Sequence, residues 1–431
     1  MTTRIFAIPK LTLMYWIVGV GLLAWLADST VTPTLPRRVG IIVSAWLAWL
    51  VITTLFAQSP ARSWFGSYDW QLGLLTQFGL VGVAWLMLIS IRDVRAARTV
   101  QWSLILASIP VILYGTMQVF QLDPFKWQAW YVSDLTVRRV FSTLGNQNYL
   151  GIYLVMAMTM TLSVLLDSKT VARRIGLGVL LIAQAWCLWL TDSRSAVIAL
   201  VVSSVFLVVW RWRFIVWQAR AALLGVVILS IVGTFVASSV LGERIADVVS
   251  PRSTIDIRPL IWESAARAVA ARPWMGWGLS SFDLAIVDHA TPAFVKRLSD
   301  PDIGGRAIDR AHNLWWELLI EVGVVGLALW GVMMAWIVDA MLTSAQDVEN
   351  RNLILTGVSV LLGYGVYQTF NPGDLGSLII FWCVLGWTLA ISVPRVEEPN
   401  RYVSYVTQTF LIVAAFGAGY GVWAWIGTLR K

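Results

Sequence analysis

Apolar runs long enough to cross a lipid bilayer recur along the whole chain, and no other feature constrains its fold so strongly. A membrane-spanning helix needs about 20 mostly apolar residues to cross roughly 30 Å of hydrocarbon. Lipid offers no partners for backbone N–H and C=O groups, so these groups must pair within helices. Of the 431 residues 58% are hydrophobic and only 13% are charged, too apolar a balance for a water-soluble domain. The sequence therefore predicts an all-α polytopic transmembrane helical bundle.

We predict about twelve membrane helices. Their approximate segments are 11–27, 39–57, 72–91, 99–120, 149–166, 175–190, 195–210, 221–240, 313–338, 352–370, 376–393 and 404–427. Many of the 26 Trp residues lie near the ends of these runs, which is typical of an interfacial aromatic belt. The chain divides into residues 1–240 with the first eight helices, one large polar loop at 241–311, and residues 312–431 with the last four.

The short connections predict the orientation of the bundle. One set of alternate connections is rich in Lys and Arg, and by the positive-inside rule it faces the cytoplasm. The large loop and both termini then lie outside. The basic residues of this set are Arg37, Arg38, Arg92, Arg95, Arg98, Lys169, Arg173, Arg174, Arg211, Arg213, Arg220, Arg351, Arg395 and Arg401. The formal net charge of +8 fits contact with anionic lipid, so we predict no nucleic-acid partner.

The large loop is predicted to contain one short helix from Arg258 to Arg272. Pro259 sits at a permitted position in the first turn, and Pro273 ends the helix. Its apolar residues recur at helical spacing, so we expect it to lie on the membrane surface or on the bundle. The segment 276–278, with glycine at both ends, is predicted to be a turn.

His312 is the first candidate for chemistry, because it is predicted to begin the ninth helix at the outer boundary of the membrane. It and His289 are the only histidines, and an unperturbed histidine titrates near neutral pH. The alternative is an interfacial residue that merely caps the helix. Glu317 and Glu321 follow on one face of the same helix, four residues apart. Glu317 lies too far around the helix for a direct pair with His312.

Several arginines are predicted to approach the same outer surface from separate loops. Arg194 occupies a very short connection between two apolar runs, where a structural ion pair with Asp192 is the alternative. Arg139 lies where another outer loop returns to the membrane, Arg258 begins the predicted loop helix, and Arg310 lies two residues before His312. The planar guanidinium group matches phosphate oxygens and keeps its charge. Together these arginines would suit a lipid-linked diphosphate.

The sequence predicts no metal site and no cofactor. Two histidines and the two cysteines, Cys187 and Cys383 within apolar runs, do not make a zinc site. A phosphate-binding loop with its lysine is absent from the sequence, so we expect no ATP-driven step.

Five stretches of sequence, taken in order, resemble the O-antigen ligase and polymerase family of bacterial membrane glycosyltransferases. The resemblance also includes the many apolar helices and the large outer loop before the histidine helix. The five stretches are residues 59–68, residues 139–148 ending in Gly-Asn-Gln-Asn, residues 193–195, residues 258–278, and His312-Asn313 followed by Glu321-x-Gly323.

The resemblance implies a GT-C-type bundle in the bacterial cytoplasmic (inner) membrane that acts outside on an undecaprenyl-diphosphate-linked glycan. It implies inverting transfer with neither nucleotide sugar nor metal. His312 matches the family's essential histidine, and Arg194 and Arg258 match arginines assigned to the diphosphate. The resemblance further implies substrate contacts by Arg139, Asn146, Asn148, Arg310, Asn313, Glu321, Arg62 and Tyr68.

The sequence leaves the acceptor open. Family members ligate the glycan to lipid A core, polymerise repeat units, or glycosylate proteins, and the donor chemistry is shared. Two alternatives come from other functional classes of protein. One is a solute transporter, for example of bicarbonate, and the other is a structural anchor of a glycan-assembly complex. The predicted chain departs from the ligases in having four helices after the large loop, where three are expected.

Overall fold

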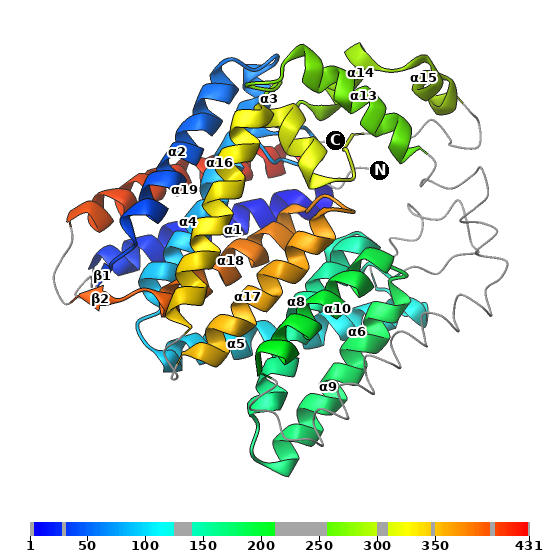
Figure 1. The fold of residues 1–431 in the computed structure, drawn as a ribbon. Coiled ribbons are helices and arrows are strands. Elements are labelled where there is room, and N and C mark those ends of the chain that lie inside the picture. The colour runs from blue at the N-terminus through cyan, green and yellow to red at the C-terminus, as the bar shows by residue number, and fades with distance from the viewer. Residues whose placement is uncertain are drawn as a thin grey trace.

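The structure, a computed structural model, describes residues 4–27, 32–124, 140–211, 257–299, 309–345, 350–396 and 401–429. It confirms an all-α helical membrane protein (Figure 1). One short antiparallel pair joins β1 (Thr32–Pro33) to β2 (Arg395–Val396). The predicted helix 221–240 and the predicted substrate residue Arg139 lie outside the described residues.

Each predicted membrane segment within the described ranges coincides with one helix, except that α5 and α6 share one segment. Before the large loop the helices are α1 (Arg4–Ala27), α2 (Arg37–Leu55), α3 (Pro60–Phe65), α4 (Leu74–Ser90), α5 (Val94–Leu106), α6 (Ser108–Val119), the 3-10 turn η1 (Ser142–Leu144), α8 (Gln147–Asp167), α9 (Val171–Leu190) and α10 (Arg194–Arg211). The loop contributes α13 (Arg258–Ala271), α14 (Phe282–His289) and α15 (Pro292–Leu298). Four long helices follow: α16 (Leu314–Ser344), α17 (Arg351–Gln368), α18 (Leu375–Ser392) and α19 (Arg401–Leu429).

Nine helices in the described ranges are long and apolar enough to cross a membrane, with α5 and α6 counted as one. The apolar helix α4 is shorter, at 17 residues. Helix α8 is buried along most of its length and packs against α9, α10 and α17. On α9, by contrast, Ile175, Val179, Ile182 and Trp186 form an exposed apolar row. Their helical spacing gives α9 one face for lipid and one for the bundle.

The basic connections and the large-loop helices lie at opposite ends of the bundle. At one end, Arg38 at the start of α2 forms an ion pair with Asp339 near the end of α16. Arg211 at the end of α10 donates a 2.7 Å hydrogen bond to the carbonyl of Asn352 at the start of α17. Helices α13 and α14 lie at the other end, beside the start of α16, and α15 packs on α13 (Figure 1).

Helix α13 has the bounds predicted from its two prolines and packs on the bundle through α16. Its buried face carries Ile261, Ala265 and Ala268. These residues form a small apolar core with Trp277 and Phe282 of the loop. The loop is therefore a folded layer with a core of its own, laid on the bundle.

Helix α16 is broken at Gly323, where the backbone has φ 69° and ψ −176°. Only glycine adopts this conformation without strain. A Cβ atom at this position would lie 2.3 Å from the carbonyl oxygen of Trp274. The loop backbone thus passes directly against the broken helix.

The loop pairs with the backbone groups that the break leaves free. The amide of Trp277 donates to the carbonyl of Ile320 over 2.7 Å, and the amide of Gly278 donates to the carbonyl of Glu321 over 2.9 Å. The indole of Trp49 donates to the carbonyl of Val322 over 2.9 Å. Because unpaired backbone groups are costly at membrane depth, the first two bonds fix the loop to α16, and the third fixes α2 to it. The predicted turn at 276–278 is the segment that docks.

Candidate functional site

A small pocket opens at the end of the bundle that carries the loop helices. Its walls come from the segment before α4, the start of α8, the segment before α16 and the turn between α17 and α18. The lining residues are Trp70, Asn146, Asn148, Tyr149, Asp309, Arg310, His312, Asn371 and Pro372. The structure therefore brings together four residues that the sequence singled out: His312, Arg310, Asn146 and Asn148.

His312 lies just before α16. It has a φ of 51°, a left-handed backbone conformation that is uncommon outside glycine and that clusters at functional sites. Asn313 caps the helix by accepting from the amides of Trp315 and Trp316, and its amide group donates to the carbonyl of Thr369 over 2.9 Å. The prediction that His312 begins the helix was therefore wrong by two residues, because Asn313 supplies the cap and Leu314 begins the helix.

The imidazole of His312 is neutral at pH 7. Burial, followed by the charge of Arg258, lowers its pKa to about 4; Asp309 opposes this shift, and Arg310 adds to it. Burial and nearby positive charge both disfavour the protonated ring. The pKa thus lies below the near-neutral value expected from the sequence. A neutral ring has one nitrogen free to accept a proton.

Arg310 is a fixed cation in the wall of the pocket. Its Nε donates to Glu317 Oε1 over 2.5 Å, and its Nη1 donates to the carbonyl of Gly373 over 3.0 Å. The guanidinium group also lies 4.8 Å from the ring centroid of Trp70. Burial lowers the pKa of Arg310, but the ion pair with Glu317 outweighs burial and the net shift is upward. Arg310 therefore stays charged and cannot move freely.

Arg194 begins α10 between two serines that tie the helix to the pocket. Ser193 donates to Asn148 Oδ1 over 2.9 Å, and Asn371 donates to the hydroxyl of Ser195 over 2.6 Å. The side chain of Arg194 is exposed. These bonds fix the backbone on both sides of Arg194 next to two residues that line the pocket.

Arg258 begins α13 and is partly buried. Burial lowers its pKa, and it is the charged group with the largest effect on the pKa of His312. The large loop thus contributes a positive charge, that of Arg258, close to His312.

Two other predicted substrate residues hold the loop and do not line the pocket. The Nη2 atom of Arg62 donates to both carboxylate oxygens of Asp283, over 2.6 and 2.7 Å, and its Nε donates to the carbonyl of Ser280 over 2.7 Å. Glu321 accepts from the amide of Ser280 over 2.8 Å. Arg62 of α3 and Glu321 of α16 therefore both form hydrogen bonds with the same loop turn at Ser280. Tyr68, between α3 and α4, is exposed and does not line the pocket.

Five lining residues were not predicted from the sequence: Trp70, Tyr149, Asp309, Asn371 and Pro372. A signal existed for Asn371, because Asn-Pro-Gly-Asp at residues 371–374 is a polar turn between two apolar runs. Trp70 is one of 26 tryptophans, and nothing in its local sequence distinguishes it. Its Nε1 donates to Asp309 Oδ2 over 2.7 Å, a contact between residues far apart in the chain.

Within the described part of the chain, no group of three or more His, Cys, Asp or Glu side chains is placed to hold a metal ion. The charged side chains that line the pocket are Asp309 and Arg310.

Comparison with protein families finds a match for part of the chain. Residues 177–331 match the model of the O-antigen ligase family, a range that contains Arg194, Arg258, Arg310 and His312. No curated protein matches the chain. The family match agrees with the resemblance seen in the sequence.

Proposed function

We propose that this protein, a member of the O-antigen ligase and polymerase family, transfers a glycan from an undecaprenyl-diphosphate carrier to an acceptor hydroxyl. One observation carries the proposal: neutral His312 and buried Arg310 line the same pocket, and the charge of Arg258 lowers the pKa of His312. Two guanidinium groups close to a neutral histidine, at one end of a membrane bundle, suit an anionic lipid head group.

The proposed step is a displacement at the anomeric carbon of the first donor sugar. The acceptor hydroxyl attacks this carbon, the bond from carbon to the diphosphate oxygen breaks, and undecaprenyl diphosphate leaves with the electron pair. The proton of the hydroxyl passes to the neutral imidazole of His312. Attack on the face opposite the leaving group inverts the anomeric configuration.

The arginines have the complementary role. Negative charge grows on the diphosphate as the bond breaks, and fixed positive groups stabilise that charge without reorganising. Arg310 is held in place by Glu317 and Gly373 and Arg258 acts from the loop. In this proposal the exposed Arg194 reaches the diphosphate from the start of α10. In this scheme the arginines supply the charge that a metal ion provides in other transferases.

Donor binding should also prepare His312 for its task. Arg258 and Arg310 both lower the pKa of His312 in the free protein. A bound diphosphate would neutralise these charges, so the pKa should rise towards the usual value and the ring should become a better base. The base is therefore strengthened only when the leaving group is in place.

This coupling predicts a split in the pH dependence. The acidic limb of kcat/KM for the donor reports the free enzyme, so it should fall near pH 4, where His312 becomes protonated. The acidic limb of kcat reports the donor complex and should lie at higher pH. Initial rates measured from pH 4 to pH 8 would show the split. Two limbs that coincide near pH 6.5 would contradict it.

Arg194 should be needed for its planar shape as well as its charge. We expect Arg194→Ala and Arg194→Lys both to lose about tenfold or more in kcat/KM for the donor, because lysine cannot bridge two phosphate oxygens with a fixed fork. The matched control is Arg174→Lys, at the far end of the bundle in α9. If Arg194→Lys transfers glycan at the normal rate, Arg194 does not bind the diphosphate in this way.

The location is proposed as the bacterial cytoplasmic membrane with the site on its outer side. The basic connections gather at the end of the bundle opposite the pocket. By the positive-inside rule that end faces the cytoplasm. A cysteine placed at Ser299, beyond α15, should then be labelled by an impermeant maleimide in intact spheroplasts.

The acceptor is proposed to be a hydroxyl of lipid A core or of a growing glycan, with a protein hydroxyl as the alternative. The purified protein would be incubated with lipid-linked oligosaccharide and each acceptor, and product sizes would be read on a gel. One shifted band identifies a ligase and a ladder identifies a polymerase. Absence of transfer to all three acceptors, together with solute uptake in proteoliposomes, would favour a transporter.

A further inference from the structure

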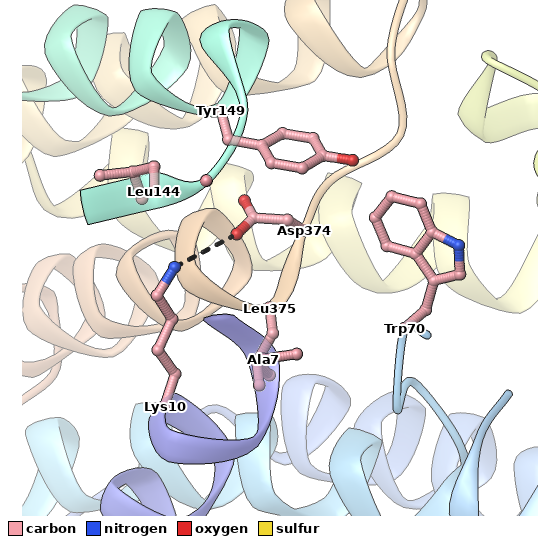
Figure 2. Close-up of a pocket in the computed structure, with 8 residues that line it drawn as sticks. Ala7, Lys10, Trp70, Leu144, Tyr149, Asp374 and Leu375 are labelled. Atoms are coloured by element: carbon pink, nitrogen blue, oxygen red, sulfur yellow. Dashed lines mark ion pairs between the residues drawn. The ribbon is translucent and has the colours of Figure 1, made fainter. Parts of the chain in front are cut away.

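A second, small pocket (Figure 2) is lined by Trp70 and Tyr149, which also line the first. The start of α1 contributes Ala7 and Lys10, and the start of α18 contributes Asp374. In Figure 2, Lys10 and Asp374 point toward each other, while Trp70 stands across the pocket from them. None of the site residues predicted from the sequence lines this pocket.

The two pockets share one aromatic wall. Trp70 and Tyr149 line both, and their rings meet edge to face with centroids 6.1 Å apart. Trp70 is held by its hydrogen bond to Asp309 and by the guanidinium group of Arg310. Ligands in the two pockets would therefore be separated by little more than these two side chains.

Lys10 retains capacity to bind a ligand. Three quarters of its side chain is buried, and its Nζ lies 3.9 Å from Asp374 Oδ2, beyond hydrogen-bond distance. Among the residues described by the structure, none accepts a hydrogen bond from Nζ. An ammonium group has three donors. These donors are therefore available to a ligand in the pocket.

Asp374 is oriented toward the pocket by the backbone of α18. Its Oδ1 accepts from the amide of Ser377 over 3.0 Å, and its Oδ2 accepts from the amide of Gly376 over 2.9 Å. A carboxylate has about four acceptor positions. Asp374 can therefore accept a further hydrogen bond from a ligand hydroxyl.

The charge of this pocket differs from that of the first. The His312 pocket has two guanidinium groups, Arg310 in its wall and Arg258 nearby, beside the carboxylate of Asp309, and paired guanidinium groups suit a diphosphate. In the second pocket the charges of Lys10 and Asp374 balance. A balanced pair beside an indole ring suits a neutral ligand with many hydroxyl groups and an apolar C–H face, which describes a hexopyranose.

We propose that the second pocket binds a neutral hexopyranose unit of the acceptor, with Lys10 and Asp374 holding hydroxyl groups and Trp70 contacting the sugar ring. This inference rests on the proposed function, because it places the second substrate of the transfer. A transferase must hold donor and acceptor together, and the shared wall brings the two sites next to each other.

The test is saturation-transfer difference NMR with the purified full-length protein in nanodiscs. The probes are the methyl glycosides of glucose, galactose and mannose. We expect at least one to show saturation transfer with the unaltered protein. Lys10→Met should weaken its binding by about tenfold or more, because a charged hydrogen bond is lost. Ala7→Phe should abolish binding by filling the pocket while keeping every polar group.

The matched control is Lys169→Met, since Lys169 is exposed in the connection between α8 and α9, and it should bind the glycoside normally. Binding of undecaprenyl diphosphate, measured on the same samples by thermal shift, shows that each variant is folded and tests the donor site separately. If the unaltered protein binds the diphosphate but no glycoside, or if Ala7→Phe still binds the glycoside, the acceptor pocket is refuted. If the unaltered protein binds no undecaprenyl diphosphate, the proposed function is refuted.

Discussion

Replacing His312 with alanine should lower the rate of glycan transfer by about a hundredfold to ten-thousandfold, the usual contribution of a general base. The ring is neutral at pH 7 because burial and Arg258 lower its pKa, so it can accept the proton of the attacking hydroxyl. Undecaprenyl diphosphate should still bind, because the arginines remain. The transfer rate of the purified variant and its affinity for the diphosphate are the two measurements.

The matched control is His289→Ala, which removes the only other histidine. His289 lies at the end of α14, with its Nδ1 atom 2.9 Å from the carbonyl of Ala285 and its ring against Trp277. It does not line the pocket of His312, so this variant should transfer glycan at nearly the normal rate. A transfer rate for His312→Ala within about tenfold of normal would exclude general base catalysis by His312, since that role contributes at least about a hundredfold.

Replacing Gly323 with alanine should prevent the normal assembly of α16 with the large loop. The required φ and ψ cost a residue with a side chain about 1–3 kcal/mol. The new Cβ atom would also meet the carbonyl oxygen of Trp274 at 2.3 Å. That neighbour is backbone and cannot rotate away, so the loop must shift. We expect a much lower yield of folded protein and a lower Tm in detergent.

Gly331→Ala provides the comparison on the same helix. A Cβ atom at Gly331 would meet nothing within 4 Å, and alanine favours a helix by about 1 kcal/mol over glycine. This variant should melt at the normal temperature or slightly above it. Equal melting temperatures for the two variants would show that the break in α16 is not required for stability.

The two predictions are connected through the loop. The break lets the loop pair with Ile320 and Glu321, and the loop carries Arg258, whose charge acts on His312. Any Gly323→Ala protein that does fold should therefore have weaker transfer activity and a His312 pKa closer to its usual value. NMR titration of the histidine ring would measure that pKa.

Much of the fold could be predicted because its causes are local. An apolar run that must pair its own backbone groups in lipid becomes a helix, so segments such as 376–393 coincide with helices such as α18. Helix α13 begins and ends beside the two prolines that predict its limits. The resemblance to a family indicated His312 and Arg258 from short sequence motifs.

Other features depended on contacts between distant residues. Arg62 and Glu321 were predicted to bind substrate, yet in the structure both bind the loop turn at Ser280. Trp70 becomes a wall of both pockets only because Asp309 and Arg310 reach it from a remote part of the chain. No local pattern distinguishes an arginine that meets a carboxylate from one that faces a substrate.

The sequence alone determined that this chain forms a helical membrane bundle with a large polar loop before its ninth predicted helix, because hydrophobicity and backbone pairing in lipid act over short stretches. The tertiary structure alone decided that α16 breaks at Gly323 to receive the loop. It also decided the pKa of His312 and the existence of a second pocket at Lys10. These features arise where separate elements pack together, and burial and charge there depend on neighbours that are remote in the chain.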